Sequence, residues 1–258
     1  MNAELLYERA GHVVRLVINR PDRRNALNDD VVNGLKEGLA RAANEAGARV
    51  VVITGAGEKA FCAGADLGGG TKRFGPDPSQ PRLPYGDLLR AARNCPLPLV
   101  ARVNGACLGG GMGLLAMCDM AIAADHATFG LPEVKVGVFP MQVAAVLMPL
   151  LAPRDLAELC FMGDAIDAEA AVRMRLVNHV VPADRLDERI AGVADRIAAN
   201  SPSALRRGRH ALASAAGLSF EQALAFFEAQ IGLVAATEDA REGIDAFLEK
   251  RAPAWTGR

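Results

Sequence analysis

The sequence predicts an α/β fold that is followed by a helical C-terminal region. Short β-branched segments alternate with helical segments in the first half of the chain, and the last third has the spacing of successive helices. With 258 residues, of which 51% are hydrophobic, the chain can bury a large core. These observations favour one long α/β unit, with a helical cap or assembly region after it.

The elements follow in order from local patterns. Alternating or β-branched runs predict strands at residues 5–9, 13–18, 50–54, 97–105 and 119–124. Helical spacing predicts helices at residues 30–45, 110–117, 168–175, 186–199, 203–213, 220–235 and 238–250. It also predicts a short helix that ends at residue 94. We expect the chain to turn helical after Pro140 and to stay so to the end.

Composition and spacing exclude several classes of protein. The 29 Lys and Arg against 30 Asp and Glu leave a net charge of −1, which does not favour binding to nucleic acid or to an anionic membrane. No apolar run approaches the ~20 residues of a membrane helix, and the start lacks a secretory pattern. An odd number of cysteines without CxxC, and histidines without metal-ligand spacing, favour a cytoplasmic protein with no metal.

A glycine run marks the first candidate site. Gly109, Gly110 and Gly111 precede an apolar helix that reaches Met117. Free N–H groups at a helix start favour an oxygen that carries negative charge. A dinucleotide-binding GxGxxG motif is excluded, because its third glycine would fall on Leu114. The remaining alternative is close packing of a helix on a strand, which glycine also permits.

Two further segments have site-like chemistry. Gly64 lies among small residues in the segment 59–67, where backbone can approach a ligand closely or form a tight turn. Glu133 lies in the otherwise small and apolar segment 129–140, and such surroundings raise a carboxyl pKa and suit a general base. The alternative is a surface glutamate paired with Lys135. Together, N–H donors and one carboxylate can remove a proton beside a carbonyl and hold the resulting oxyanion.

The chain resembles the crotonase superfamily, also called the enoyl-CoA hydratase/isomerase family, over nearly its whole length. The resemblance rests on motifs that occur in family order: NRPDRRNALN, KAFCAGADL, VNGACLGGGMGL followed by CDMAIAAD, FGLPEVKVG and the tail AFLEKRAPAW. It implies a crotonase-like spiral of ββα units over residues 1–200 and a helical trimerisation region over 201–258. It also implies a homotrimer or a dimer of trimers.

The same resemblance implies an acyl-CoA thioester substrate, with CoA as part of the substrate and no separate cofactor. It places an oxyanion hole on the backbone N–H groups of Ala65 and Gly110, and the catalytic acid/base on Glu133. The residues implied to contact substrate or CoA are Arg23, Arg24, Ala26, Ala63, Ala65, Asp66, Leu67, Gly68 and Lys250, the last one reaching a CoA phosphate of its own or a neighbouring subunit.

One departure from the family pattern bears on the reaction. Hydratases of the family carry two glutamates that hold one water, and the first of these positions is Gly113 here. One base favours isomerase-like chemistry, in which Glu133 moves a proton along a thioester enolate. The alternatives are a true hydratase, in which Glu133 acts alone or a second group comes from the loop 68–84; a hydrolase or decarboxylase; and a non-catalytic CoA-binding homologue. The run MQVAAVLM after Pro140 also departs from the family and implies a reshaped acyl pocket.

Overall fold

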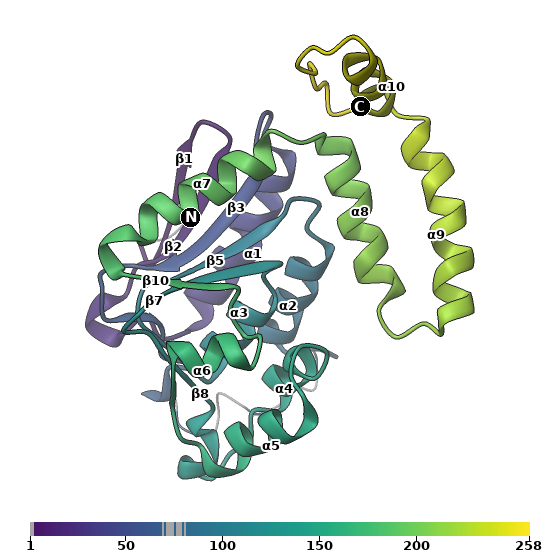
Figure 1. The fold of residues 1–258 in the computed structure, drawn as a ribbon. Coiled ribbons are helices and arrows are strands. Elements are labelled where there is room, and N and C mark those ends of the chain that lie inside the picture. Colours follow the sequence, from purple (N-terminus) through teal and green to yellow (C-terminus); the bar gives the residue numbers. More distant parts are fainter. Residues whose placement is uncertain (1–2, 69, 71–74, 76–78, 80) are drawn as a thin grey trace.

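The computed structural model describes residues 3–68, 70, 75, 79 and 81–258. A six-stranded sheet forms the centre, in the order β1-β2-β3-β5-β7-β10 (Figure 1). Its strands are β1 (Leu5–Ala10), β2 (Val13–Ile18), β3 (Val50–Gly55), β5 (Leu99–Val103), β7 (Met120–Ala124) and β10 (His179–Val181). β1 pairs antiparallel with β2, and every other pair is parallel. The parallel strands are apolar because both faces of this sheet are covered.

A second sheet of short strands lies beside the first, in the order β4-β6-β8-β9. Its strands are β4 (Ala60–Cys62), β6 (Ala106–Leu108), β8 (Thr128–Gly130) and β9 (Ile166–Asp167). The chain passes from the large sheet to the small one three times, through β3 to β4, β5 to β6 and β7 to β8. Helix α2 (Pro84–Asn94) follows the first passage and α3 (Gly110–Ala116) the second. This succession is the spiral of ββα units that the family resemblance implies.

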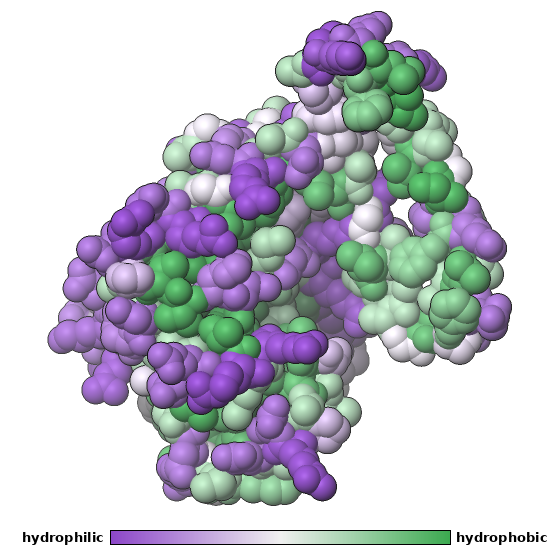
Figure 2. Space-filling view, viewed as in Figure 1, coloured by the Kyte–Doolittle hydropathy of each residue, from purple (hydrophilic) through white to green (hydrophobic). Residues whose placement is uncertain are grey.

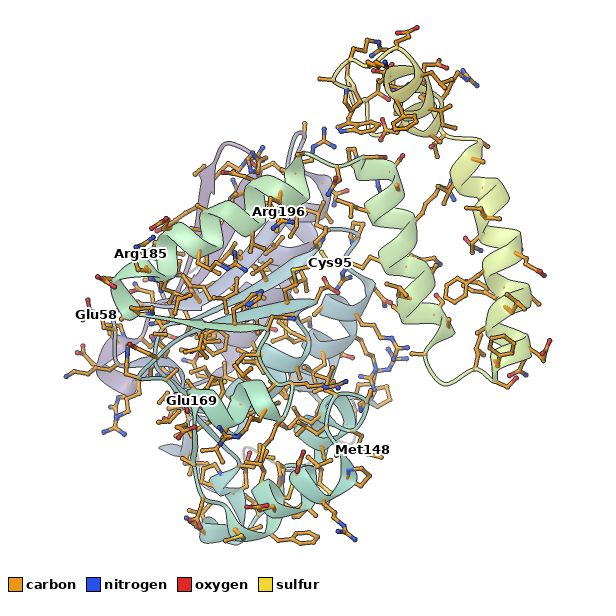
Figure 3. All side chains as sticks on the ribbon, viewed as in Figure 1. Glu58, Cys95, Met148, Glu169, Arg185 and Arg196 are labelled. Carbon is orange, nitrogen blue, oxygen red and sulfur yellow. The ribbon has the colours of Figure 1, made fainter. Side chains whose placement is uncertain are left out.

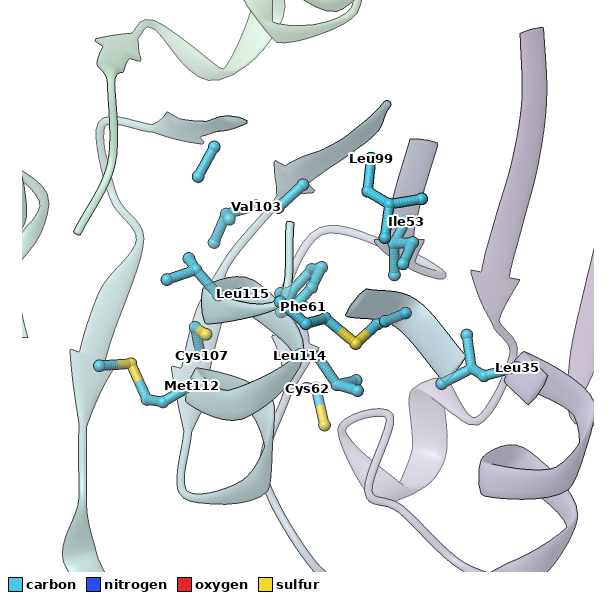
Figure 4. Close-up of a cluster of buried hydrophobic side chains, with 14 of the residues drawn as sticks. Leu35, Ile53, Phe61, Cys62, Leu99, Val103, Cys107, Met112, Leu114 and Leu115 are labelled. Carbon is cyan, nitrogen blue, oxygen red and sulfur yellow. The ribbon is translucent and has the colours of Figure 1, made fainter. Parts of the chain in front are cut away.

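The main core lies between the sheets and the helices α1 (Asp29–Asn44), α2 and α3. Figure 4 shows its centre, where Phe61, Cys62, Cys107 and Leu114 pack together. On the other face of the large sheet, α7 (Leu186–Ala198) covers a separate apolar cluster. The α3 helix therefore sits on a rigid base, with its N-terminus at the edge of the small sheet.

The prediction of uninterrupted helix after Pro140 is wrong. The helices α4 (Met141–Leu147), α5 (Pro153–Met162) and α6 (Ala168–Arg173) do follow, but β9 and β10 interrupt them. β10 adds the last strand of the large sheet by pairing with β7. Strands of two or three residues are too short for an alternating pattern, and pairing with a distant strand creates them. The 3-10 helices Pro21–Arg23 (η1), Pro132–Val136 (η3) and Ala183–Arg185 (η4) complete the body.

The last helices form an arm that stands away from the body (Figure 1). They are α8 (Pro202–Ala215), α9 (Phe220–Ala235) and α10 (Glu238–Leu248). α9 buries no residue, and Phe220 and Ile231 are 74% and 65% exposed. Figure 2 shows hydrophobic residues, in green, along this helix. Among the described helices, none is both long and apolar enough to cross a membrane.

Arg209 fastens this arm to the body. Its guanidinium pairs with Asp119 at 2.7 Å and donates to the carbonyls of Ala92 and Cys95 at the end of α2. Figure 3 shows Cys95 at this junction, beside α8. The Trp255 indole donates to the Ala199 carbonyl at 2.8 Å and ties the tail back to α7. Arg209 is therefore a structural residue of α8, since its side chain is only 10% exposed.

Candidate active site

A cavity of about 520 Å³ opens where the N-terminus of α3 meets the segment after β4. Its wall is mostly apolar, and its acidic lining residues within the described part of the chain are Asp29 and Glu133. The remaining lining includes Leu27, Ala63, Gly64, Ala65, Leu67, Leu83, Tyr85, Gly109, Gly110, Lys135, Val136, Phe139, Met141, Gln142 and Val143. Such an apolar cavity with a few polar groups is typical of a small-molecule site.

Two backbone N–H groups converge on this cavity. The Leu27 N–H donates to Gly64 O and the Asp66 N–H to Leu27 O, each at 2.8 Å. This pairing fixes the segment so that the Ala65 N–H makes no backbone hydrogen bond within the described residues. The Gly110 nitrogen is the first of α3, and a Cβ placed on Gly110 would lie 3.8 Å from the Ala65 nitrogen. The Ala65 and Gly110 nitrogens therefore lie near each other at the cavity wall, as two donors to one oxygen atom would have to.

The glycines around these donors are required by the backbone geometry. Gly64 has φ +93°, and a Cβ there would lie 3.0 Å from Leu108 O and 3.3 Å from the Gly110 nitrogen. Gly109 has φ +52°, and a Cβ on Gly111 would overlap the Cys62 carbonyl. Only glycine adopts the first two conformations without strain and permits the close approach at the third. The Cys62 thiol itself is buried, which raises its pKa to about 12 and excludes it as a nucleophile.

Glu133 faces these donors from the short helix η3. Its Oε1 lies 2.9 Å from the position that a Cβ on Gly109 would take, and its Oε2 is buried with no hydrogen-bond partner in the described chain. Burial raises the pKa of this carboxyl. Lys135 pairs instead with Asp164 at 2.5 Å, so the alternative of a Glu133–Lys135 surface pair is wrong.

Tyr85 occupies the space beside Gly113. Gly113 is buried, and a Cβ there would overlap the Tyr85 hydroxyl and lie 3.2 Å from Tyr85 Cζ and 3.4 Å from Val143 Cγ2. The Tyr85 hydroxyl donates to the Gly110 carbonyl at 2.6 Å. Burial raises the Tyr85 pKa well above its ordinary value, so the side chain is a neutral phenol. Sequence reasoning missed Tyr85, because no pattern tells which residue of α2 meets α3.

Two other carboxylates of the described part of the chain, Asp119 and Asp29, are candidates for a second acidic group beside Glu133. Asp119 accepts the Leu99 N–H at 2.7 Å and pairs with Arg209, so it holds the fold together. Asp29 lines the cavity from the N-terminus of α1 and has an interaction partner of its own. The loop 68–84 was the other expected source of a second group, and its residues 69, 71–74, 76–78 and 80 lie outside the described residues.

The predicted CoA-contact residues fall into two groups. Ala63, Ala65 and Leu67 line the cavity, and their contact with a thioester stays a prediction. Asp66 does not offer a free carboxylate: it pairs with Arg20 at 2.8 Å, which lowers its pKa, and it accepts the Gly68 N–H at 3.1 Å.

The basic residues predicted to contact CoA are not among the residues that line the cavity. Arg23 and Arg24 are exposed at the end of η1, and the Arg24 carbonyl accepts the Ala63 N–H at 3.0 Å, which places this turn next to the cavity segment. The Ala26 carbonyl in the same turn accepts a bond from Arg20 at 2.7 Å. Lys250 follows α10, on the arm that stands apart from the body (Figure 1), so one chain does not bring it to its own cavity.

These groups can perform one kind of chemistry together. A half-buried carboxylate with one oxygen free of hydrogen bonds can take a proton from carbon, and two N–H donors can hold the oxyanion that forms beside it. Within the described ranges, no cluster of His, Cys, Asp and Glu side chains could hold a metal ion. The arrangement of Glu133 and the two N–H donors fits proton transfer next to a carbonyl.

Comparisons with known proteins agree with this geometry. A family model described as enoyl-CoA hydratase/isomerase matches residues 8–258. The chain is 36% identical to the 2,3-dehydroadipyl-CoA hydratase of Escherichia coli (strain K12), over 99% of this chain and 100% of that protein. It is 33% identical to a crotonyl-CoA hydratase of Syntrophomonas wolfei, over 96% and 95% of the two chains.

The fold is also that of solved members of this group. The crystal structure of an enoyl-CoA hydratase/isomerase from Mycobacterium paratuberculosis matches with a TM-score of 0.92 and 31% identity, over 99% of each chain. The predicted crotonase-like fold is thereby confirmed. On the match to the family model and the full-length similarity to these relatives, the chain belongs to the enoyl-CoA hydratase/isomerase family of the crotonase superfamily.

Proposed function

We propose that this acyl-CoA enzyme is a one-base isomerase that shifts the double bond of a 3-enoyl thioester. Glu133 removes a proton from the α-carbon, and the electrons of that C–H bond form a dienolate. The Ala65 and Gly110 N–H groups hold the thioester oxygen while it carries negative charge. Glu133 then returns the proton to the γ-carbon, so the double bond moves from the β,γ to the α,β position. The reaction needs no cofactor beyond the CoA of the substrate.

The observation that carries this proposal is that Glu133 lies in the same cavity as Tyr85, and that Tyr85 fills the space beside Gly113 where a second carboxylate would have to fit. Glu133 has an unpaired buried oxygen at the donors, whereas the Gly113 side of the cavity holds the neutral hydroxyl of Tyr85. Water addition needs groups that both orient the water and accept its proton. Proton transfer between two carbons of one substrate needs only a single base within reach.

Hydration is the second candidate, because the named relatives above are hydratases. The test is to incubate the protein with crotonyl-CoA and with 3-hexenoyl-CoA, and to follow thioester absorbance and products. We expect isomerisation of 3-hexenoyl-CoA to exceed hydration of crotonyl-CoA. Hydration at an equal or higher rate would contradict the proposal.

The pH dependence of the reaction should report the environment of Glu133. The base works only as a carboxylate, and burial raises its pKa. We therefore expect kcat/KM to fall, as pH is lowered, at a higher pH than the ordinary glutamate pKa of about 4.3 would give. The measurement is a pH–rate profile with 3-hexenoyl-CoA. An acid limb at or below that ordinary value would show that the catalytic base is not in a desolvated site.

The arm supports a proposal on assembly. We propose that residues 201–258 form the trimerisation region beside a core of residues 1–200, because the exposed apolar face of α9 has no partner within the described part of one chain. Light scattering should give a trimer or a dimer of trimers, and Ile231→Glu should shift it toward monomer. A wild-type monomer at micromolar concentration would contradict this prediction.

We also propose that exposed basic side chains bind the nucleotide end of CoA. Arg23 and Arg24 suit this role because they are exposed and form no ion pair in the described structure. Lys250 would reach the same end of CoA from a neighbouring subunit. All five cysteines are free, which supports a location in the reducing cytoplasm.

A further inference from the structure

We propose that Tyr85 is the residue that restricts this site to one-base chemistry, because it fills the space that a side chain at position 113 would need. This inference rests on the proposed isomerase function and names a specificity-determining residue for it. On this inference, the residue at position 85 determines which side chains position 113 can hold, although the two positions lie on different helices, α2 and α3.

The first argument is steric. A Cβ on Gly113 would overlap the Tyr85 hydroxyl, and it would also meet Tyr85 Cζ at 3.2 Å and Val143 Cγ2 at 3.4 Å. Moving the ring aside would break the hydrogen bond of its hydroxyl to the Gly110 carbonyl, which is 2.6 Å long. Gly113 is itself buried, so a longer side chain has no direct route to solvent. A carboxylate at 113 is therefore disfavoured while Tyr85 holds this position.

The second argument is chemical. Tyr85 lines the same cavity as Gly110 and Glu133, and its hydroxyl lies where the first atom of a side chain at position 113 would be. The proton of that hydroxyl is donated to the Gly110 carbonyl, and a neutral phenol does not accept a proton from water as a carboxylate does. Tyr85 therefore fills the space beside Gly113 without providing a group that could act as a base.

The test is a double-mutant cycle between the two positions. The variants are Gly113→Glu, Tyr85→Ala and the double variant, with Tyr85→Phe to separate the hydroxyl from the ring. Gly192→Glu is the matched control, because it places the same side chain on the exposed face of α7, where a Cβ would meet no atom within 4 Å. Each protein is measured for Tm, for hydration of crotonyl-CoA and for isomerisation of 3-hexenoyl-CoA.

We expect Gly113→Glu alone to lower Tm by about 5 °C, as overpacking of a buried site does, and to leave the ratio of hydration to isomerisation low. In the Tyr85→Ala background, Gly113→Glu should lower Tm by less than half as much as in the wild type. The ratio of hydration to isomerisation of this double variant should rise at least about tenfold over wild type. In the Tyr85→Phe background, the loss of Tm caused by Gly113→Glu should be intermediate, because the ring remains. Gly192→Glu should not lower Tm, because glutamate is a better helix former than glycine, and it should leave the ratio unchanged.

Two outcomes would overturn the inference. One is an equal loss of Tm from Gly113→Glu in the wild-type and Tyr85→Ala backgrounds, and the other is a double variant whose ratio stays at the wild-type value. These outcomes are distinct from a failure of the proposed function, which would appear in the wild type as hydration that matches isomerisation. The Tm coupling does not depend on which reaction the wild type catalyses.

Discussion

Glu133→Gln is expected to lower isomerase turnover by at least about 10²–10⁴-fold, which is the contribution of a positioned acid/base. The amide has nearly the same shape as the carboxylate but does not accept the proton. No other carboxylate in the described structure stands at the two N–H donors to take its place. The measurement is kcat with 3-hexenoyl-CoA at a pH where the Glu133 carboxylate is ionised.

The control for this variant is Glu169→Gln, on the exposed face of α6 (Figure 3). It makes the same chemical change at a side chain that is 85% exposed, and turnover should stay at the wild-type level. Glu133→Gln should also keep its Tm and its affinity for an acyl-CoA, since no hydrogen bond of Oε2 is lost. If Glu133→Gln retains more than about a tenth of wild-type turnover, another group moves the proton.

The long elements could be predicted from the sequence because their patterns are local. The helix α9 was predicted at its observed bounds, and β3 is the apolar run that a strand covered on both faces requires. β9 and β10 escaped prediction for the opposite reason. Three residues of β10 carry no period of their own, and their strand geometry comes from pairing with β7, which lies far away in the sequence.

The same distinction holds at the site. The glycines at 64 and 109 could be singled out locally, because Gly64 lies among small residues after a strand and Gly109 opens a glycine run before an apolar helix. The structure brings both to the cavity together with Glu133 and shows that each has a positive φ. Tyr85 could not be found this way, because its role depends on how α2 packs beside α3. Arg209 is a similar case. Its guanidinium donates to the carbonyls of Ala92 and Cys95 at the end of α2, and the residue spacing within α8 does not predict these contacts.

The oxyanion donors give the other large expected effect, through a pair of variants at Gly110. Gly110 is the first residue of α3, where proline is well tolerated, and its φ is not among the positive values. Gly110→Pro removes the N–H and adds a side chain. Gly110→Ala keeps the N–H and adds only a Cβ, which would lie 3.0 Å from Leu27 Cδ1. The difference between the two variants therefore isolates the donor from the added bulk.

We expect Gly110→Pro to turn over 3-hexenoyl-CoA about 10²–10³-fold more slowly than Gly110→Ala, because one donor to a developing oxyanion contributes about 3–4 kcal/mol. The N–H of Ala65 remains in both variants and accounts for the residual rate. Circular dichroism and Tm must show that α3 still forms in Gly110→Pro, since the ring also constrains Gly109. Equal turnover of two folded variants would remove the Gly110 N–H from the reaction, and the thioester oxygen would then have to bind elsewhere in the cavity.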